Sequence, residues 1–126
     1  MTDLTLITSI IDVPRNKALT YSVVRSVFSK DDRFAQLKKT IENVKVKMPS
    51  NRIFLVECSQ LNEAETEYIK NNTDYFLNIL EETPDAIDEI TSESKAMCEG
   101  TMTICALDYL FKRRIPFNNL FKISGR

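Results

Sequence analysis

Four short runs of apolar and β-branched residues, separated by segments with helical periodicity, constrain the fold of this chain more than any other feature. The runs are residues 3–11, 53–56, 75–80 and 120–123. Runs of this kind suit strands that are covered on both faces, as in a parallel sheet. We therefore predict a three-layer α/β/α domain. Its sheet should be Rossmann-like and mostly parallel, with about four strands. Right-handed crossover helices should join these strands.

Two of the intervening helices carry clear start signals. Ser29 with Asp32 three places later forms a capping pattern, and a second pattern places Asn62 before Glu65. After the first signal, apolar residues recur at spacings of three and four until Pro49 ends the helix. These residues are Phe34, Leu37, Ile41, Val44 and Met48. In the second helix we expect Leu61, Tyr68 and Ile69 to point inward.

The longest predicted helix covers residues 94–114. Its apolar residues Met97, Ile104, Leu107, Leu110 and Phe111 fall on one face, which we expect to be the inner one. Gly100 should allow close packing in the first half of this helix. Lys112, Arg113 and Arg114 suit the negative end of the helix dipole. Residues 81–93 are acidic, contain Pro84 and predict an exposed loop.

Composition excludes several kinds of catalytic and binding site. The length of 126 residues is that of a single domain. The chain contains no histidine, so Ser-His-Asp and Cys-His nucleophiles are absent. The three cysteines form no Cys-x-x-Cys pair, which argues against a zinc site. Only two glycines occur, so the chain has neither a P-loop nor a dinucleotide fingerprint.

Charge and hydropathy indicate where the protein works. A net charge of -1 gives no basic excess to attract nucleic acid. No apolar run approaches the roughly 20 residues of a membrane helix, so we expect no transmembrane segment. No signal peptide is visible, and the thiols suit a reducing compartment. We expect a cytoplasmic protein.

Candidate binding residues follow from the rule that ligands of open α/β sheets bind beyond the carboxyl ends of the strands. Glu57 follows the second strand, where it could accept hydrogen bonds from a base or a ribose, or cap the next helix. Lys95 and Glu99 lie one turn apart, either as an intrahelical ion pair or with Lys95 facing a ligand phosphate. Arg25 lies in an apolar stretch and needs an anionic partner, for which an internal carboxylate is the better explanation. Ser124 and Arg126 end the last strand, where an arginine could bind phosphate or form part of a simple turn.

Several motifs together resemble the N-terminal half of GT-A-type glycosyltransferases, in particular a bacterial and viral group. They are residues 21–26, 33–36 with 40–41, 55–59, 94–99 and 121–126, the last reading Phe-Lys-Ile-Ser-Gly-Arg. The resemblance implies a nucleotide-sugar-binding domain over residues 1–126. In it, Thr8 and Ser9 would line the nucleoside pocket, Glu57 would lie near the base, and Lys95 and Glu99 would flank the donor.

Two departures from the family pattern qualify this expectation. The tip Ser124-Gly125-Arg126 stands where many GT-A enzymes carry an Asp-x-Asp metal motif. This does not favour a Mg²⁺ or Mn²⁺ cofactor, and Arg126 could offset diphosphate charge instead. The family fold also continues into an acceptor-binding half, so we expect this chain to be a truncated version. No catalytic residue can be assigned from the sequence.

Three functional hypotheses remain open at this point. The first is a glycosyltransferase-like protein that moves a sugar from a nucleotide donor to a glycan or lipid-linked acceptor. The second is a non-catalytic nucleotide-binding fragment with the same fold. The third is a flavodoxin-like interaction or signalling domain, which Asp12 after the first strand fits only in part.

Overall fold

The sheet of the computed structural model has four parallel strands in the order β3-β2-β1-β4. The structure describes residues 2–11, 29–82 and 95–124, with only the backbone at 95–98. The strands are β1 (Leu4–Ser9), β2 (Arg52–Glu57), β3 (Tyr75–Asn78) and β4 (Leu120–Ser124). The predicted α/β class with a parallel sheet is therefore confirmed. The order matches the first four strands of the Rossmann arrangement, whereas a flavodoxin-like order would place the third strand beside the first.

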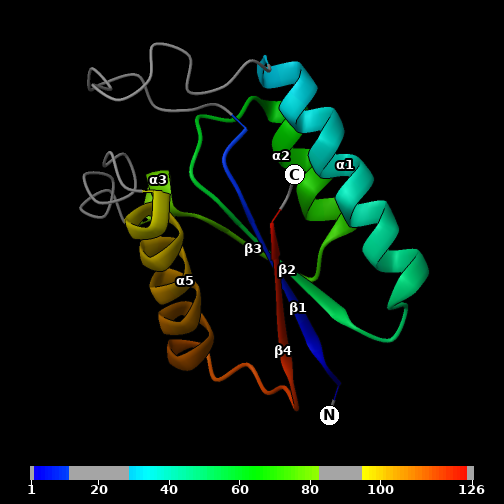
Figure 1. The fold of residues 1–126 in the computed structure, drawn as a ribbon, viewed down its shortest axis with the longest axis vertical. Coiled ribbons are helices and arrows are strands. Elements are labelled where there is room, and N and C mark those ends of the chain that lie inside the picture. The colour runs from blue at the N-terminus through cyan, green and yellow to red at the C-terminus, as the bar shows by residue number, and fades with distance from the viewer. Residues whose placement is uncertain (1, 12–28, 83–94, 125–126) are drawn as a thin grey trace.

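Helices cover both faces of this sheet. Figure 1 shows α1 (Lys30–Lys47) and α2 (Glu63–Asn72) on one side and α5 (Lys95–Lys112) on the other. Within the described residues, no helix is both long and apolar enough to cross a membrane. The three-layer arrangement expected from the sequence is present.

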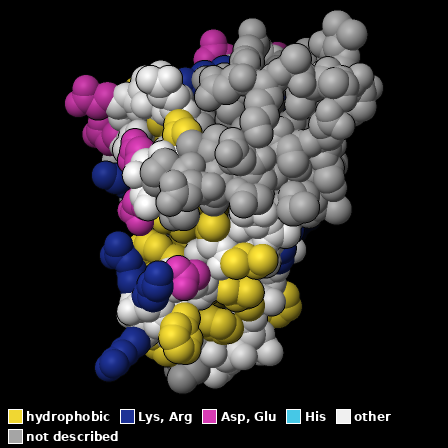
Figure 2. All heavy atoms as spheres, turned by 90° about the vertical axis from the view of Figure 1, so that its left-hand side faces the viewer, with side chains coloured by type: hydrophobic (Ala, Val, Ile, Leu, Met, Phe, Trp, Pro, Cys, Tyr) yellow, Lys and Arg dark blue, Asp and Glu magenta, His cyan; other side chains and the backbone are white. Residues whose placement is uncertain are grey.

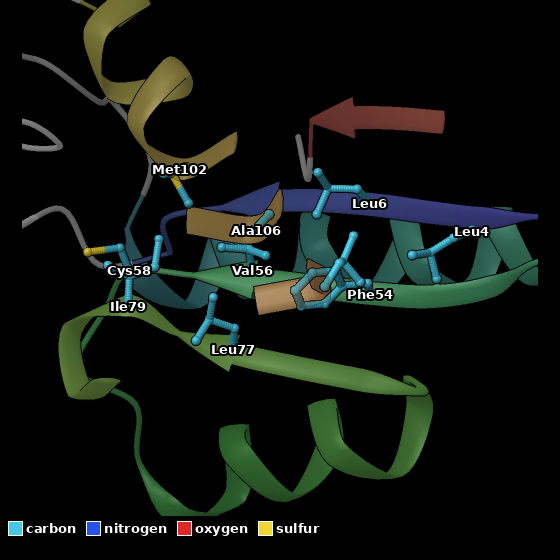
Figure 3. Close-up of a cluster of buried hydrophobic side chains, with 10 residues drawn as sticks. Leu4, Leu6, Phe54, Val56, Cys58, Leu77, Ile79, Met102 and Ala106 are labelled. Carbon is cyan, nitrogen blue, oxygen red and sulfur yellow. The ribbon is translucent and has the colours of Figure 1, made fainter. Parts of the chain in front are cut away.

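Each face of the sheet has its own apolar cluster. On the α1 side, Ile7 and Leu55 pack with Leu37, Ile41 and Ile69 of the two helices. On the α5 side, strand residues Leu4, Leu6, Phe54 and Val56 pack with helix residues Met102 and Ala106, as Figure 3 shows. The alternation along each strand explains the split, because successive side chains point to opposite faces.

The capping predictions for α1 and α2 are confirmed. Ser29 and Asn62 each accept the backbone N–H three residues later, and Asp32 and Glu65 return the bond to the cap residue. The apolar stripe of α1 also faces inward, with Leu37, Ile41 and Val44 buried. Helix starts are local hydrogen-bond patterns, which explains why short sequence signals located them.

The third strand is shorter than predicted. It ends at Asn78, and residues 79–80 belong to a short helix, α3 (Ile79–Glu82). The Asn78 side chain accepts the backbone N–H of Leu80 at 3.2 Å. A side chain that bonds the backbone two residues ahead turns the chain away from the ladder.

The predicted inner face of α5 is mostly wrong. Met102, Ala106 and Leu110 are buried, whereas Ile104, Leu107 and Phe111 are exposed. Periodicity could not choose the buried stripe because apolar residues occur on both sides of this helix. Gly100 is also exposed, and an added Cβ would meet no atom within 4 Å. It therefore does not serve close packing.

Candidate functional site

The carboxyl edge of the sheet has a topological switch point between β1 and β4. From β1 the chain continues through α1 on one face to β2, while β4 is reached through α5 on the other face. In the ladder, Thr8 pairs with Ser124, and Ser9 pairs with Glu57. A crevice between oppositely directed connections is where open α/β sheets bind ligands. The predicted residues Thr8, Ser9, Glu57 and Ser124 thus end three adjacent strands.

One polar cluster joins β1, α5 and β4 at this switch point. The Thr8 hydroxyl donates to Glu99 Oε2 at 3.1 Å, and Lys122 Nζ lies 3.1 Å from the same oxygen. Thr8 is buried, while the side chains of Glu99 and Lys122 are 33% and 38% exposed. The cluster therefore places a partly accessible ammonium beside a hydroxyl, a combination that can bind an anionic oxygen.

Glu99 has a cationic partner that helical spacing did not suggest. Among the described side chains it pairs with Lys122, 23 residues later. An ion pair with Lys95, one turn earlier, stays a prediction. The side chain of Lys95 lies outside the described part, so its own role stays a prediction. The backbone places Lys95 at the first residue of α5. Lys122 was not singled out in the sequence because its position inside an apolar run gave no sign of a neighbouring carboxylate.

Glu57 is a buried carboxyl on the other side of the same edge. Its Oε1 accepts the backbone N–H of Ile11 at 2.9 Å and the Ser59 hydroxyl at 2.7 Å. Within the described residues, Oε2 has no hydrogen-bond partner. Burial raises the pKa of Glu57 to about 7, although the hydrogen bonds from Ser59 and Ile11 lower it in part. Near neutral pH the protonated and ionised forms of Glu57 therefore have similar free energies.

The cluster and Glu57 face opposite sides of the sheet. Thr8 bonds Glu99 of α5. Glu57 lies two residues after Leu55 in β2 and therefore on the same face, the α1 side. The two carboxylates therefore do not form a pair. Within the described residues, no group of three or more Cys, Asp or Glu side chains could hold a metal ion.

Two further buried polar residues shape this edge and were missed as site residues. Arg33 of α1 donates to the carbonyl of Ile10 at 2.7 Å, just beyond β1. Asn78 donates to the carbonyl of Ser59 at 2.9 Å and fixes the loop after β2. Arg33 had a sequence signal, because it lies four residues before Leu37 on the buried stripe of its helix.

The remaining predicted site residues lie at the tip of β4 or outside the described residues. Ser124 is exposed at the tip of β4. Arg25 and Arg126 lie outside the described residues, as does Asp12. Comparisons of this chain with protein-family models, with curated proteins and with solved structures gave no match.

Proposed function

We propose that this domain binds a nucleotide-sugar donor at the carboxyl edge of its sheet, between the ends of β1 and β4. The observation that carries the proposal is the Thr8–Glu99–Lys122 cluster at the topological switch point. Ligands of this fold class bind at such points, and a lysine offers a point charge to phosphate. The resemblance to GT-A-type glycosyltransferases adds the sugar and its transfer to a glycan or lipid-linked acceptor.

In this proposal each residue has a distinct task. The Lys122 ammonium exchanges the Glu99 carboxylate for the donor diphosphate, and the Thr8 hydroxyl remains as a second donor. Ser9 lies close to the nucleoside. Glu57, which the resemblance places near the base, holds Ile11 and Ser59 at this edge. The donor site predicted from the sequence contains four further residues, Arg25, Lys95, Ser124 and Arg126.

Calorimetric titration with UDP- and GDP-sugars tests donor binding directly. We expect binding by the wild type and a loss of about tenfold or more in Lys122→Met, because a hydrogen bond to a charged group contributes about 1.5–3 kcal/mol. Lys45→Met is the matched control, since Lys45 bonds Asn72, far from this cluster on the exposed surface of α1. A folded wild type that binds none of the donors would refute the proposal.

A non-catalytic nucleotide-binding protein is the second candidate. It is favoured by the state of the two carboxylates at this edge, since Glu99 is paired with Lys122 and Glu57 is fully buried. Before a donor binds, neither carboxylate is available to activate an acceptor hydroxyl. Donor hydrolysis and transfer assays separate the candidates, because turnover by this chain alone would exclude the non-catalytic one.

A further inference from the structure

The outer side of α5 carries apolar side chains where a surface helix normally carries polar ones. Ile104, Leu107 and Phe111, at spacings of three and four, are 68%, 44% and 85% exposed. Figure 2 looks onto this side of the molecule and shows hydrophobic side chains gathered on it. Contiguous exposed apolar patches of this kind mark interaction sites.

A groove continues this stripe at the C-terminal end of the helix. It has a volume of about 520 Å³ and shares Leu107 and Phe111 with the stripe. Its other lining residues are Leu110, Arg114, Ile115 and Phe117. A hollow of this size and lining can take one or two large apolar side chains. We refer to the stripe and the groove together as the α5 surface.

Positive charge borders the α5 surface. Lys112, Arg113 and Arg114 are consecutive and exposed, and Arg114 itself lines the groove. Lys112 and the nearby Asp108 form an ion pair at 3.0 Å, so Arg113 and Arg114 carry the net positive charge of this border. In Figure 2, Lys and Arg side chains lie along one border of the hydrophobic patch. The charge of this border is therefore complementary to carboxylates.

The backbone at Arg114 adds an independent observation. Arg114 has a φ of 53°, the left-handed conformation in which glycine is usual after a helix. Its N–H bonds the carbonyl of Phe111 at 3.2 Å, and the N–H of Ile115 bonds that of Leu110 at 3.0 Å. These are the two bonds of a Schellman motif. An arginine is thus held against a backbone preference while its side chain lines the groove.

We infer that the α5 surface docks an amphipathic helix of a partner protein that carries carboxylates along one flank. Its apolar side chains would pack on Ile104, Leu107 and Phe111 and enter the groove, as in other helix-in-groove complexes. Its carboxylates would meet Arg114 and the adjacent cations. A second copy of this chain fits less well, because a symmetric contact would bring two cationic borders into one interface.

Two designed helical peptides with identical apolar residues test this inference by fluorescence anisotropy with the full chain. One carries glutamates along a single flank, and the other carries lysines at the same positions. We expect the glutamate peptide to bind at least tenfold more tightly than the lysine peptide. Added salt should weaken this binding. Equal binding of the two peptides, or no binding of the glutamate peptide, would overturn the inference.

Variants locate the binding surface. Phe111→Ser should lower the affinity for the glutamate peptide at least tenfold. Val46→Ser should leave this affinity unchanged, although Val46 on α1 is also exposed, at 80%. Arg114→Gly should raise the melting temperature and yet lower the affinity for the glutamate peptide. A purely structural role of Arg114 would not produce this combination. Wild-type affinity in Arg114→Gly would overturn the inference. So would dimerisation in sedimentation that Phe111→Ser abolishes.

Discussion

The helices α1 and α5 have the same length of 18 residues and cover opposite faces of one sheet, yet their outer sides differ. The outer side of α1 is mainly charged, with Lys39, Glu42 and Lys45 exposed. The outer side of α5 exposes a row of large apolar residues instead. Packing on the sheet therefore uses only one side of α5, and its other apolar side stays exposed.

The two helices also begin differently. The first turn of α1 holds Asp31 and Asp32 behind the Ser29 cap, which complements the helix dipole. The first turn of α5 holds no acidic residue and begins with Lys95. We conclude that local capping interactions stabilise the start of α1.

Matched leucine truncations should separate the inner side of α1 from the outer side of α5 most strongly. Leu37 is fully buried and Leu107 is 44% exposed. Leu37→Ala should lower the free energy of unfolding by about 2–5 kcal/mol, and Leu107→Ala by less than about 1 kcal/mol. Urea denaturation measures both. Equal losses would contradict the difference between the two helices, because they would mean that the α5 stripe contributes to the core.

The α1 side should also show a pH dependence through Glu57. Its pKa is about 7 in the folded protein and near 4.5 when unfolded, so the native state holds the proton over this interval. Stability should therefore fall as pH rises from about 4.5 to about 7, by about 3 kcal/mol. Glu57→Gln should remove most of this dependence and be more stable than the wild type at pH 8.

Denaturation curves at several pH values measure this effect. Glu67→Gln, on the exposed side of α2, serves as the control and should keep the wild-type profile. If Glu57→Gln retained the full fall in stability, the buried carboxyl would not be its cause.

The start of α1 offers a smaller effect. Ser29→Ala removes the acceptor of the Asp32 N–H, so we expect a loss of about 1 kcal/mol in the free energy of unfolding. Ser29→Asp should restore most of the stability, because aspartate also caps helices well. A loss that aspartate cannot restore would point to a role other than capping.

Gly100→Ala should have the smallest effect, and in the opposite direction. The site is exposed and open, so alanine should stabilise α5 by about 0.8–1 kcal/mol through helix propensity alone. Thermal unfolding measures the gain. A loss of stability would show that Gly100 is in close contact with another part of the molecule, contrary to the open surface described above.

Part of the candidate site could be predicted from the sequence. Strand-end reasoning pointed to Glu57 and Ser124, and the resemblance pointed to Thr8 and Ser9. All four end parallel strands, whose carboxyl ends lie at one edge of the sheet. Helical spacing offered only Lys95 as a neighbour of Glu99, since it reports contacts within one helix. It did not find Lys122, which meets Glu99 across two elements.

By itself, the sequence determined the four strands and the helices α1, α2 and α5 of the described residues, but not the short helix α3. Caps, breakers and apolar runs act over a few residues, so the starts of α1 and α2 and the parallel strands followed from local chemistry. The tertiary structure alone decided which side of α5 is buried and which cation Glu99 meets. Both depend on contacts between residues far apart in the chain, and α5 has two apolar sides of which one sheet can cover only one.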